Sequence, residues 1–174
     1  MKKIITAVVS ILLVLAMAVG CKVSTAQAKI IANYAGLFSS VTWIAYDNPS
    51  ASAIEGVKTV LDVIVQKASD IESGKTYLET IYPELVKFID EKIPEQDRPL
   101  CKAASLTLLN GIDTLFSMHP EWKTDQDFAL DLVKSYIDGA KIGLGLRADD
   151  KIMIQARSAA EARAKALEKK GWFE

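Results

Sequence analysis

Histidine is almost absent from this chain, and with it the side chain that many metal centres and general bases use. The only one, His119, lies between Met118 and Pro120, with no second histidine and no nearby cysteine at a metal-ligand spacing. No G-x-S-x-G pattern for a nucleophilic serine occurs. We therefore expect no enzyme, no metal and no cofactor, and we interpret His119 as a structural or exposed residue.

Neither sign of charge dominates, which argues against a nucleic-acid partner. The chain has 21 lysines and arginines against 22 aspartates and glutamates. Without Lys2 and Lys3, 19 basic side chains stand against the same 22 acidic ones. A nucleic-acid-binding surface needs a basic patch or stripe. We expect no nucleic acid among the partners.

Two clusters resemble ligand loops but lack the residues that such loops need. The first cluster consists of Gly139, Gly143 and Gly145. It follows a helical pattern rather than a strand, and no Lys-Ser/Thr comes after it, so it indicates the end of a helix rather than a phosphate loop. The other lacks the glycine and the distal glutamate of a calcium loop and indicates a capped helix start: Asp125, Asp127 and Asp131.

A long apolar run is present at the start of the chain. Lys2 and Lys3 precede residues 4–19, which are apolar except for Thr6 and Ser10, and small residues follow. A positive start, an apolar core and a small-residue exit are typical of a secretory signal. Two alternatives stay open: ordinary cleavage after the A-x-A pattern at residues 26–28, and an uncleaved anchor over residues 4–20, at the short limit for a bilayer span.

The stretch Ala18-Val19-Gly20-Cys21 resembles the lipobox of bacterial lipoproteins. The resemblance implies that residues 1–20 are a signal peptide that is removed. It also implies that the sulfur of Cys21 carries diacylglycerol and that its amino end carries a further chain such as palmitate. In that family an aspartate after the cysteine favours the inner membrane. Because Lys22 stands there, we expect an exported protein at the outer membrane of a host with two membranes.

Behind the signal, apolar residues recur at spacings of three and four, which predicts helices. These stripes cover residues 25–46, 52–72, 75–93, 99–118, 125–142 and 149–170. We predict an all-α chain: a short tether over residues 21–26, then a single compact helical bundle of five or six helices over residues 27–146. Residues 147–174 are expected to form an Ala-rich charged helix, loosely held and free to project.

Local signals predict several helix ends. Capping-box spacing occurs at residues 52–55 and, with the shorter acid, at residues 124–127. Asp97 suits the N-cap of a helix with proline in its first turn. Pro83 is expected to kink or split the segment 75–93, and residues 73–74 to stop the helix before it.

Cys101 lies on the apolar stripe of the helix expected over residues 99–118. We therefore expect a buried, inert thiol. The alternative is a disulfide between Cys21 and Cys101 in a protein that was never lipidated.

These features favour a non-enzymatic, membrane-anchored envelope lipoprotein that acts as a helical protein–protein interaction or structural module. Its expected partners are the membrane, through Cys21, and another envelope protein. The candidate interaction surface is the small face of the last helix and the aromatic residues behind it: Ala156, Ala160, Leu167, Trp172 and Phe173.

Two alternatives to this function stay open. One is a carrier of a small apolar ligand in the bundle core, with an aromatic lining: Tyr34, Trp43, Tyr77, Tyr82 and Tyr136. The other is an analogy with short phage and prophage lipoproteins of similar appearance, some of which block a surface receptor.

Overall fold

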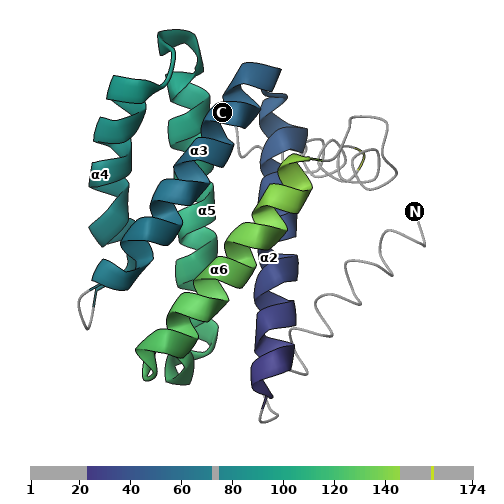
Figure 1. The fold of residues 1–174 in the computed structure, drawn as a ribbon. Coiled ribbons are helices and arrows are strands. Elements are labelled where there is room, and N and C mark those ends of the chain that lie inside the picture. Colours follow the sequence, from purple (N-terminus) through teal and green to yellow (C-terminus); the bar gives the residue numbers. More distant parts are fainter. Residues whose placement is uncertain (1–22, 72–74, 146–157, 159–174) are drawn as a thin grey trace, which may run out of the picture.

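The computed structural model describes residues 23–71, 75–145 and 158, and within these residues it contains five α-helices and no strand (Figure 1). The helices are α2 (Thr25–Asp47), α3 (Ala51–Lys67), α4 (Tyr77–Lys92), α5 (Arg98–Met118) and α6 (Gln126–Leu144). Short 3₁₀ turns connect them: η1 (Ala68–Asp70), η2 (Glu95–Asp97) and η3 (Pro120–Lys123). The all-α prediction is confirmed. The helix predicted over residues 149–170 lies outside the described residues, apart from residue 158.

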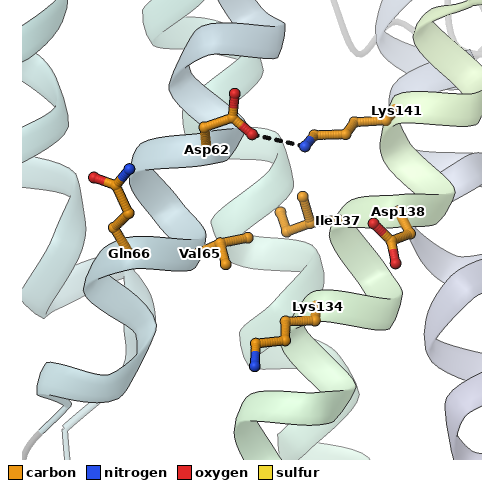
Figure 2. A pocket seen from close by; sticks show the side chains of 7 residues that line it. All are labelled: Asp62, Val65, Gln66, Lys134, Ile137, Asp138 and Lys141. Carbon is orange, nitrogen blue, oxygen red and sulfur yellow. Dashed lines mark hydrogen bonds and ion pairs between the residues drawn. The ribbon is translucent and has the colours of Figure 1, made fainter.

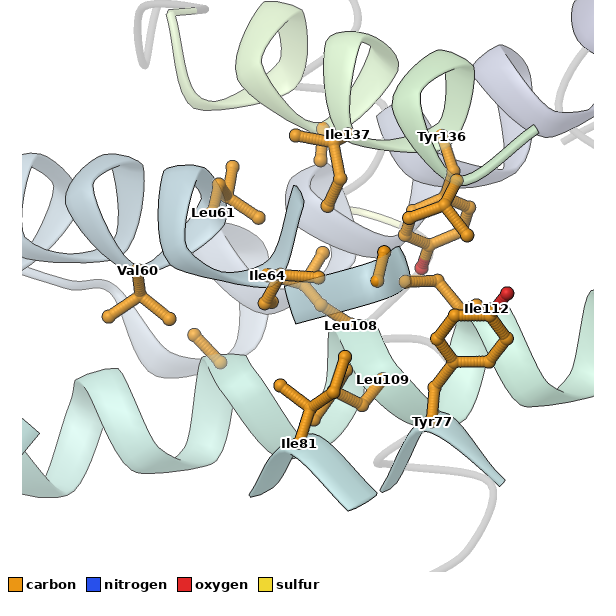
Figure 3. Close-up of a cluster of buried hydrophobic side chains, with 14 of the residues drawn as sticks. Val60, Leu61, Ile64, Tyr77, Ile81, Leu108, Leu109, Ile112, Tyr136 and Ile137 are labelled. Atoms are coloured by element: carbon orange, nitrogen blue, oxygen red, sulfur yellow. The ribbon is translucent and has the colours of Figure 1, made fainter. Parts of the chain in front are cut away.

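The five helices pack compactly, with α2 and α4 at opposite edges of the bundle (Figure 1). Helix α5 contacts α2, α3 and α4, and α6 packs on α2 and α3. Fully buried aliphatic side chains from four helices meet in one core (Figure 3): Leu61 and Ile64 of α3, Ile81 of α4, Leu108, Leu109 and Ile112 of α5, and Ile137 of α6. Each contributes roughly 1.5–3 kcal/mol by its burial.

The capping boxes predicted at residues 52–55 and 124–127 are wrong, because each helix takes its cap from a neighbouring residue. Ser50 is the N-cap of α3, and its Oγ accepts from the Ala53 N–H at 3.0 Å. Ser52 already lies inside the first turn. The hydroxyl of Thr124 donates to the Glu121 carbonyl, within the preceding turn. Asp125 therefore caps α6 in its place.

Capping boxes do form at two other helix starts. Ser24 and Gln27 cap α2, and Thr76 and Glu79 cap α4, each pair by reciprocal side-chain and backbone hydrogen bonds. The bonds from Thr76 to the Glu79 carboxylate hold the pKa of that group below its usual value. These contacts fix the start of α2 at Thr25, so the helix begins inside the segment 21–26 that the sequence predicts as a tether.

Pro83 does not split the segment 75–93, since α4 runs unbroken through it. A proline at this position removes the hydrogen bond to the carbonyl of Glu79. Both residues lie on the exposed side of α4, where solvent can satisfy that carbonyl. The opposite side is held in the core by four buried residues: Tyr77, Ile81, Leu85 and Ile89.

Other predicted helix ends have mixed outcomes. Helix α3 ends at Lys67 and tightens into η1, short of the predicted stop at residues 73–74. Helix α2 ends at Asp47, and Asn48 caps it with a left-handed φ of 43°, a conformation that suits asparagine. Asp97 precedes α5 but makes no capping bond with its side chain, because its backbone is already helical there.

Candidate functional site

The lipidation residue and the predicted interaction surface lie outside the described residues. This holds for Cys21 and for all members of that surface: Ala156, Ala160, Leu167, Trp172 and Phe173. Both assignments stay predictions. The described body offers four further features for comparison: the α2–α6 seam, the outer side of α2, a groove between α3 and α6, and two buried polar clusters.

The α2–α6 seam brings two helices into backbone contact. Helix α2 presents small buried residues at a spacing of four: Ala28, Ala32, Gly36 and Ser40. A Cβ added to Gly36 would lie 1.8 Å from the Tyr136 carbonyl oxygen. One on Gly139 would lie 1.8 Å from the Asn33 carbonyl oxygen. Only glycine permits this approach. The predicted helix end at the glycine cluster is confirmed, because α6 ends at Leu144, while Gly139 and Gly143 lie inside α6 at the seam. Gly145 alone caps α6.

Polar contacts fix the register of the seam. Lys29 Nζ lies 2.8 Å from Asp131 Oδ2, and Asn33 Nδ2 donates to the carbonyl of Ser135 at 3.1 Å. Farther along α6, the Tyr136 hydroxyl donates to Ser39 Oγ at 2.6 Å. Residue numbers rise together along both helices, so the first and last described helices run parallel. Burial raises the pKa of Tyr136 to about 12, although the Ser39 contact acts in the opposite direction.

The outer side of α2 is an exposed apolar ridge, formed by five residues at a spacing of four: Ile30, Tyr34, Phe38, Thr42 and Tyr46. Ile30 is 56% exposed, Tyr34 58% and Phe38 42%. No charged residue occurs in α2 between Lys29 and Asp47. An exposed helix face in a globular protein is normally charged or polar. We refer to these five residues as the α2 ridge.

The sequence pattern predicted the helix correctly but did not show that its large apolar residues face outward. They recur with a helical period, which is typical of a core-facing stripe. The buried side begins instead with the row of small residues from Ala28 to Ser40 and continues with Val41, Trp43 and Ile44. That row is the signal in the sequence that identifies the inner side of α2, and hence the ridge.

A groove of about 460 Å³ lies between α3 and α6 (Figure 2). Its lining is mostly polar and charged: Asp62, Val65, Gln66, Lys134, Ile137, Asp138 and Lys141. Lys141 Nζ closes one end by an ion pair with Asp62 Oδ1 at 2.6 Å. Pockets for small apolar ligands are lined mainly by hydrophobic and aromatic groups. The groove between α3 and α6 therefore does not resemble a pocket for a small apolar ligand, because its lining is mostly polar and charged.

The aromatic residues considered for a carrier are not gathered around this groove. Tyr34 is exposed on α2, whereas Trp43 and Tyr136 are core residues. Tyr77 stacks on Phe116, with ring centroids 5.3 Å apart. Core packing explains the buried members of the set.

Asp97 and Cys101 form a buried cluster where the starts of α3 and α5 meet. Asp97 is 3% exposed, and its Oδ1 accepts from Ser50 Oγ at 3.0 Å. The Cys101 thiol donates to the Ala53 carbonyl at 3.7 Å. Burial, helped by the charge of Asp97, raises the pKa of this thiol to about 11. The prediction of a buried thiol is confirmed, and its protonated form at neutral pH makes it a poor nucleophile.

His119 is also buried, at 5% exposed. Its ring stacks on Trp122 at 3.9 Å, and its Nδ1 lies 3.1 Å from Glu121 Oε1. Trp122 in turn meets the edge of Phe128. These contacts join the end of α5 to the start of α6, which is a structural role.

Metal-ligating residues do not gather anywhere in the described ranges, where no group of three or more His, Cys, Asp or Glu side chains is placed to hold an ion. None of the helices α2–α6 is long and apolar enough to cross a membrane. Comparison of the chain with protein-family models, with curated proteins and with solved structures finds no match.

Proposed function

We propose that this protein is an envelope lipoprotein, anchored through acylated Cys21, that acts by protein–protein contact and carries out no catalysis. The observation that carries the proposal is the Gly20-Cys21 pair directly behind a charged start and an apolar run. Each buried methylene of a lipid chain contributes about 0.8 kcal/mol, and two or more chains are needed for stable anchoring.

The start of the folded body supports this arrangement. Ser24 is already the N-cap of α2, so only Lys22 and Val23 separate it from Cys21. A fully extended chain advances at most about 3.6 Å per residue, so Cys21 lies within roughly 14 Å of Thr25. An anchor at Cys21 therefore holds the body directly at the bilayer surface. Lys22 favours the outer membrane if the host has two.

We place the protein contact on the C-terminal segment 147–174. Its small residues allow close approach of a partner helix, and Trp172 and Phe173 are large aromatic groups of the kind that anchor interfaces. The partner class is another protein of the same envelope.

Intact mass of the membrane-extracted protein tests the anchor. A mass equal to residues 21–174 plus acyl chains, absent in a Cys21→Ala variant, is the expected result. A mass that begins at Lys29 without lipid would refute the lipoprotein assignment.

Deletion of residues 149–174 tests the contact surface. We expect crosslinking to an envelope partner in intact cells to be lost on deletion, and to persist in a Leu106→Ser variant, which alters an exposed apolar residue of α5. A circular dichroism spectrum of the deleted protein checks that the bundle stays folded. Unchanged crosslinking after the deletion would show that the surface lies elsewhere.

A further inference from the structure

The α2 ridge has the chemistry of a surface that is covered in the working protein. It extends from Ile30 to Tyr46, over about 24 Å at the helical rise of 1.5 Å per residue. Its large members are between 42% and 58% exposed. The residues that flank the ridge are also uncharged: Ile31, Ala35 and Ala45 are half-buried, and Ile31 and Ala35 pack against the core. A contiguous exposed apolar surface of this kind marks a contact site.

The ridge lies close to the proposed anchor. Ile30 is only nine residues beyond Cys21. The last six of these nine residues, 25–30, already belong to the start of α2. The acyl chains of Cys21 would bring the bilayer within roughly 14 Å of Thr25. At the edge of the bundle where α2 lies, no other described helix covers its outer side (Figure 1).

The composition of the ridge suits a lipid interface. Aromatic residues with a polar tip favour the head-group level, and Tyr34 and Tyr46 provide two of them. Ile30 and Phe38 can enter the boundary of the acyl chains, as the apolar face of an interfacial helix does, to a depth of about 5–10 Å. The nearest cation of α2, Lys29, is paired with Asp131 on the α6 side, away from the ridge.

We infer that the α2 ridge rests on the bilayer in which Cys21 is anchored, so that α2 lies along the membrane surface. This inference rests on the proposed lipoprotein function and adds a second membrane contact to the lipid chains. It also gives the body an orientation. The opposite edge, which α4 forms, faces away from the membrane.

The C-terminal segment suits the ridge less well. Between its cluster of apolar residues at 152–154 and Gly171, Leu167 is the only large apolar side chain, and the rest is alanine, charged or, at Gln155 and Ser158, polar. Small residues cannot bury four large side chains along 24 Å of helix. A bilayer covers such a length without any sequence match.

Depth-dependent fluorescence quenching tests the inference in the lipidated protein. A single cysteine is placed on the ridge (Tyr34→Cys or Phe38→Cys) or away from it (Leu106→Cys on α5 or Lys87→Cys on α4), and is labelled with an environment-sensitive fluorophore. Cys101 is fully buried and its thiol pKa is raised to about 11, so it does not compete for the label. The labelled protein is bound to vesicles of phosphatidylethanolamine with a minority of phosphatidylglycerol and of nitroxide-labelled lipid, which is the quencher.

We expect quenching at positions 34 and 38 to exceed that at positions 87 and 106 by at least about twofold, as burial at the head-group boundary requires. Equal quenching at all four positions would overturn the inference. So would ridge labels protected from both the nitroxide and aqueous iodide, because that pattern would mean that the C-terminal segment or a second copy covers the ridge.

The mass measurement separates this inference from the proposed function. If Cys21 proves to carry no lipid, the lipoprotein proposal fails, and the same labels are read on the same vesicles in the unlipidated protein with Cys21→Ser, so that the introduced cysteine is again the one that reacts. Preferential quenching at positions 34 and 38 would then still support the ridge as a membrane contact, and its absence would overturn it.

Discussion

Alanine at Gly36 or Gly139 should weaken the bundle by separating α2 from α6. A Cβ at either position lies 1.8 Å from a carbonyl oxygen, whereas real Cβ atoms essentially never come within 3.0 Å of another heavy atom. The two backbones must therefore separate locally by about 1.2 Å. Rotation of a side chain cannot relieve the clash, because the obstacle is backbone.

The size of the effect follows from two opposed contributions. Overpacking costs about 1–3 kcal/mol, and a gap of roughly 0.5–1 Å already loses a quarter to a half of the dispersion energy between facing atoms. Alanine regains about 0.5–1 kcal/mol over glycine inside a helix. Since the clash is with backbone, the cost of overpacking should lie near the upper end of this range, at about 3 kcal/mol. We expect a net loss of about 2 kcal/mol for each variant.

Urea unfolding followed by circular dichroism measures this loss in the mature chain with Cys21→Ser. Gly145→Ala is the matched control, because its φ is −86° and its added Cβ meets only ordinary contacts, the nearest at 3.4 Å. It should change the free energy of unfolding by less than about 0.5 kcal/mol. The double variant Gly36→Ala with Gly139→Ala should lose less than the sum of the two, since one separation relieves both clashes. If both single variants match Gly145→Ala, the backbone contact between α2 and α6 is not present.

Three further predictions concern buried polar groups. Asp113→Ala should cost about 1–2 kcal/mol in urea unfolding, because this α5 carboxylate accepts from the first two N–H groups of α4 at 2.8 and 2.9 Å; no loss would show that α4 does not need this cap. Tyr136→Phe should cost about 1 kcal/mol through the lost bond to Ser39. Burial raises the Tyr136 pKa from 10.0 to about 12, so the contribution of the protonated hydroxyl to folding stability is intact below pH 10 and lost as pH rises toward 12. The Tyr136→Phe variant should therefore lose stability less steeply at alkaline pH than the unsubstituted chain. An equally steep dependence of the free energy of unfolding on pH would contradict this. The Cys101 thiol should react with a disulfide reagent only after unfolding at neutral pH, and rapid reaction of the folded protein would refute its burial.

The sequence was sufficient for the fold class and for most of the helix order. Apolar residues at spacings of three and four mark one side of a helix whatever its neighbours are, and all five described helices lie where such stripes predict them. Proline and glycine placed several ends correctly, as at Met118 before Pro120 and at Gly145. These signals act through local backbone geometry, which a short stretch of sequence carries by itself.

Helix caps were harder to predict, because neighbouring polar residues compete for the same role. Ser50 and Ser52 can each accept from a backbone N–H, and only the observed backbone shows that Ser50 is extended and Ser52 helical. Asp97 suits a cap by composition, yet its carboxylate turns to Ser50 of another helix. A long-range partner of this kind leaves no local signal.

The sequence by itself determined that the chain is helical, and the proposed signal with its lipobox-like exit also rests on the sequence alone, because both depend on residues adjacent along the chain. Only the tertiary structure decided which side of α2 faces outward. The large apolar residues of that helix suited a core, but the core side went to Ala28, Ala32 and Gly36. The reason is steric: α6 approaches to backbone contact, and only small side chains fit between the two helices. Val41, Trp43 and Ile44 still reach the core beyond this contact, whereas Ile30, Tyr34, Phe38 and Tyr46 are left outside, where they form the α2 ridge.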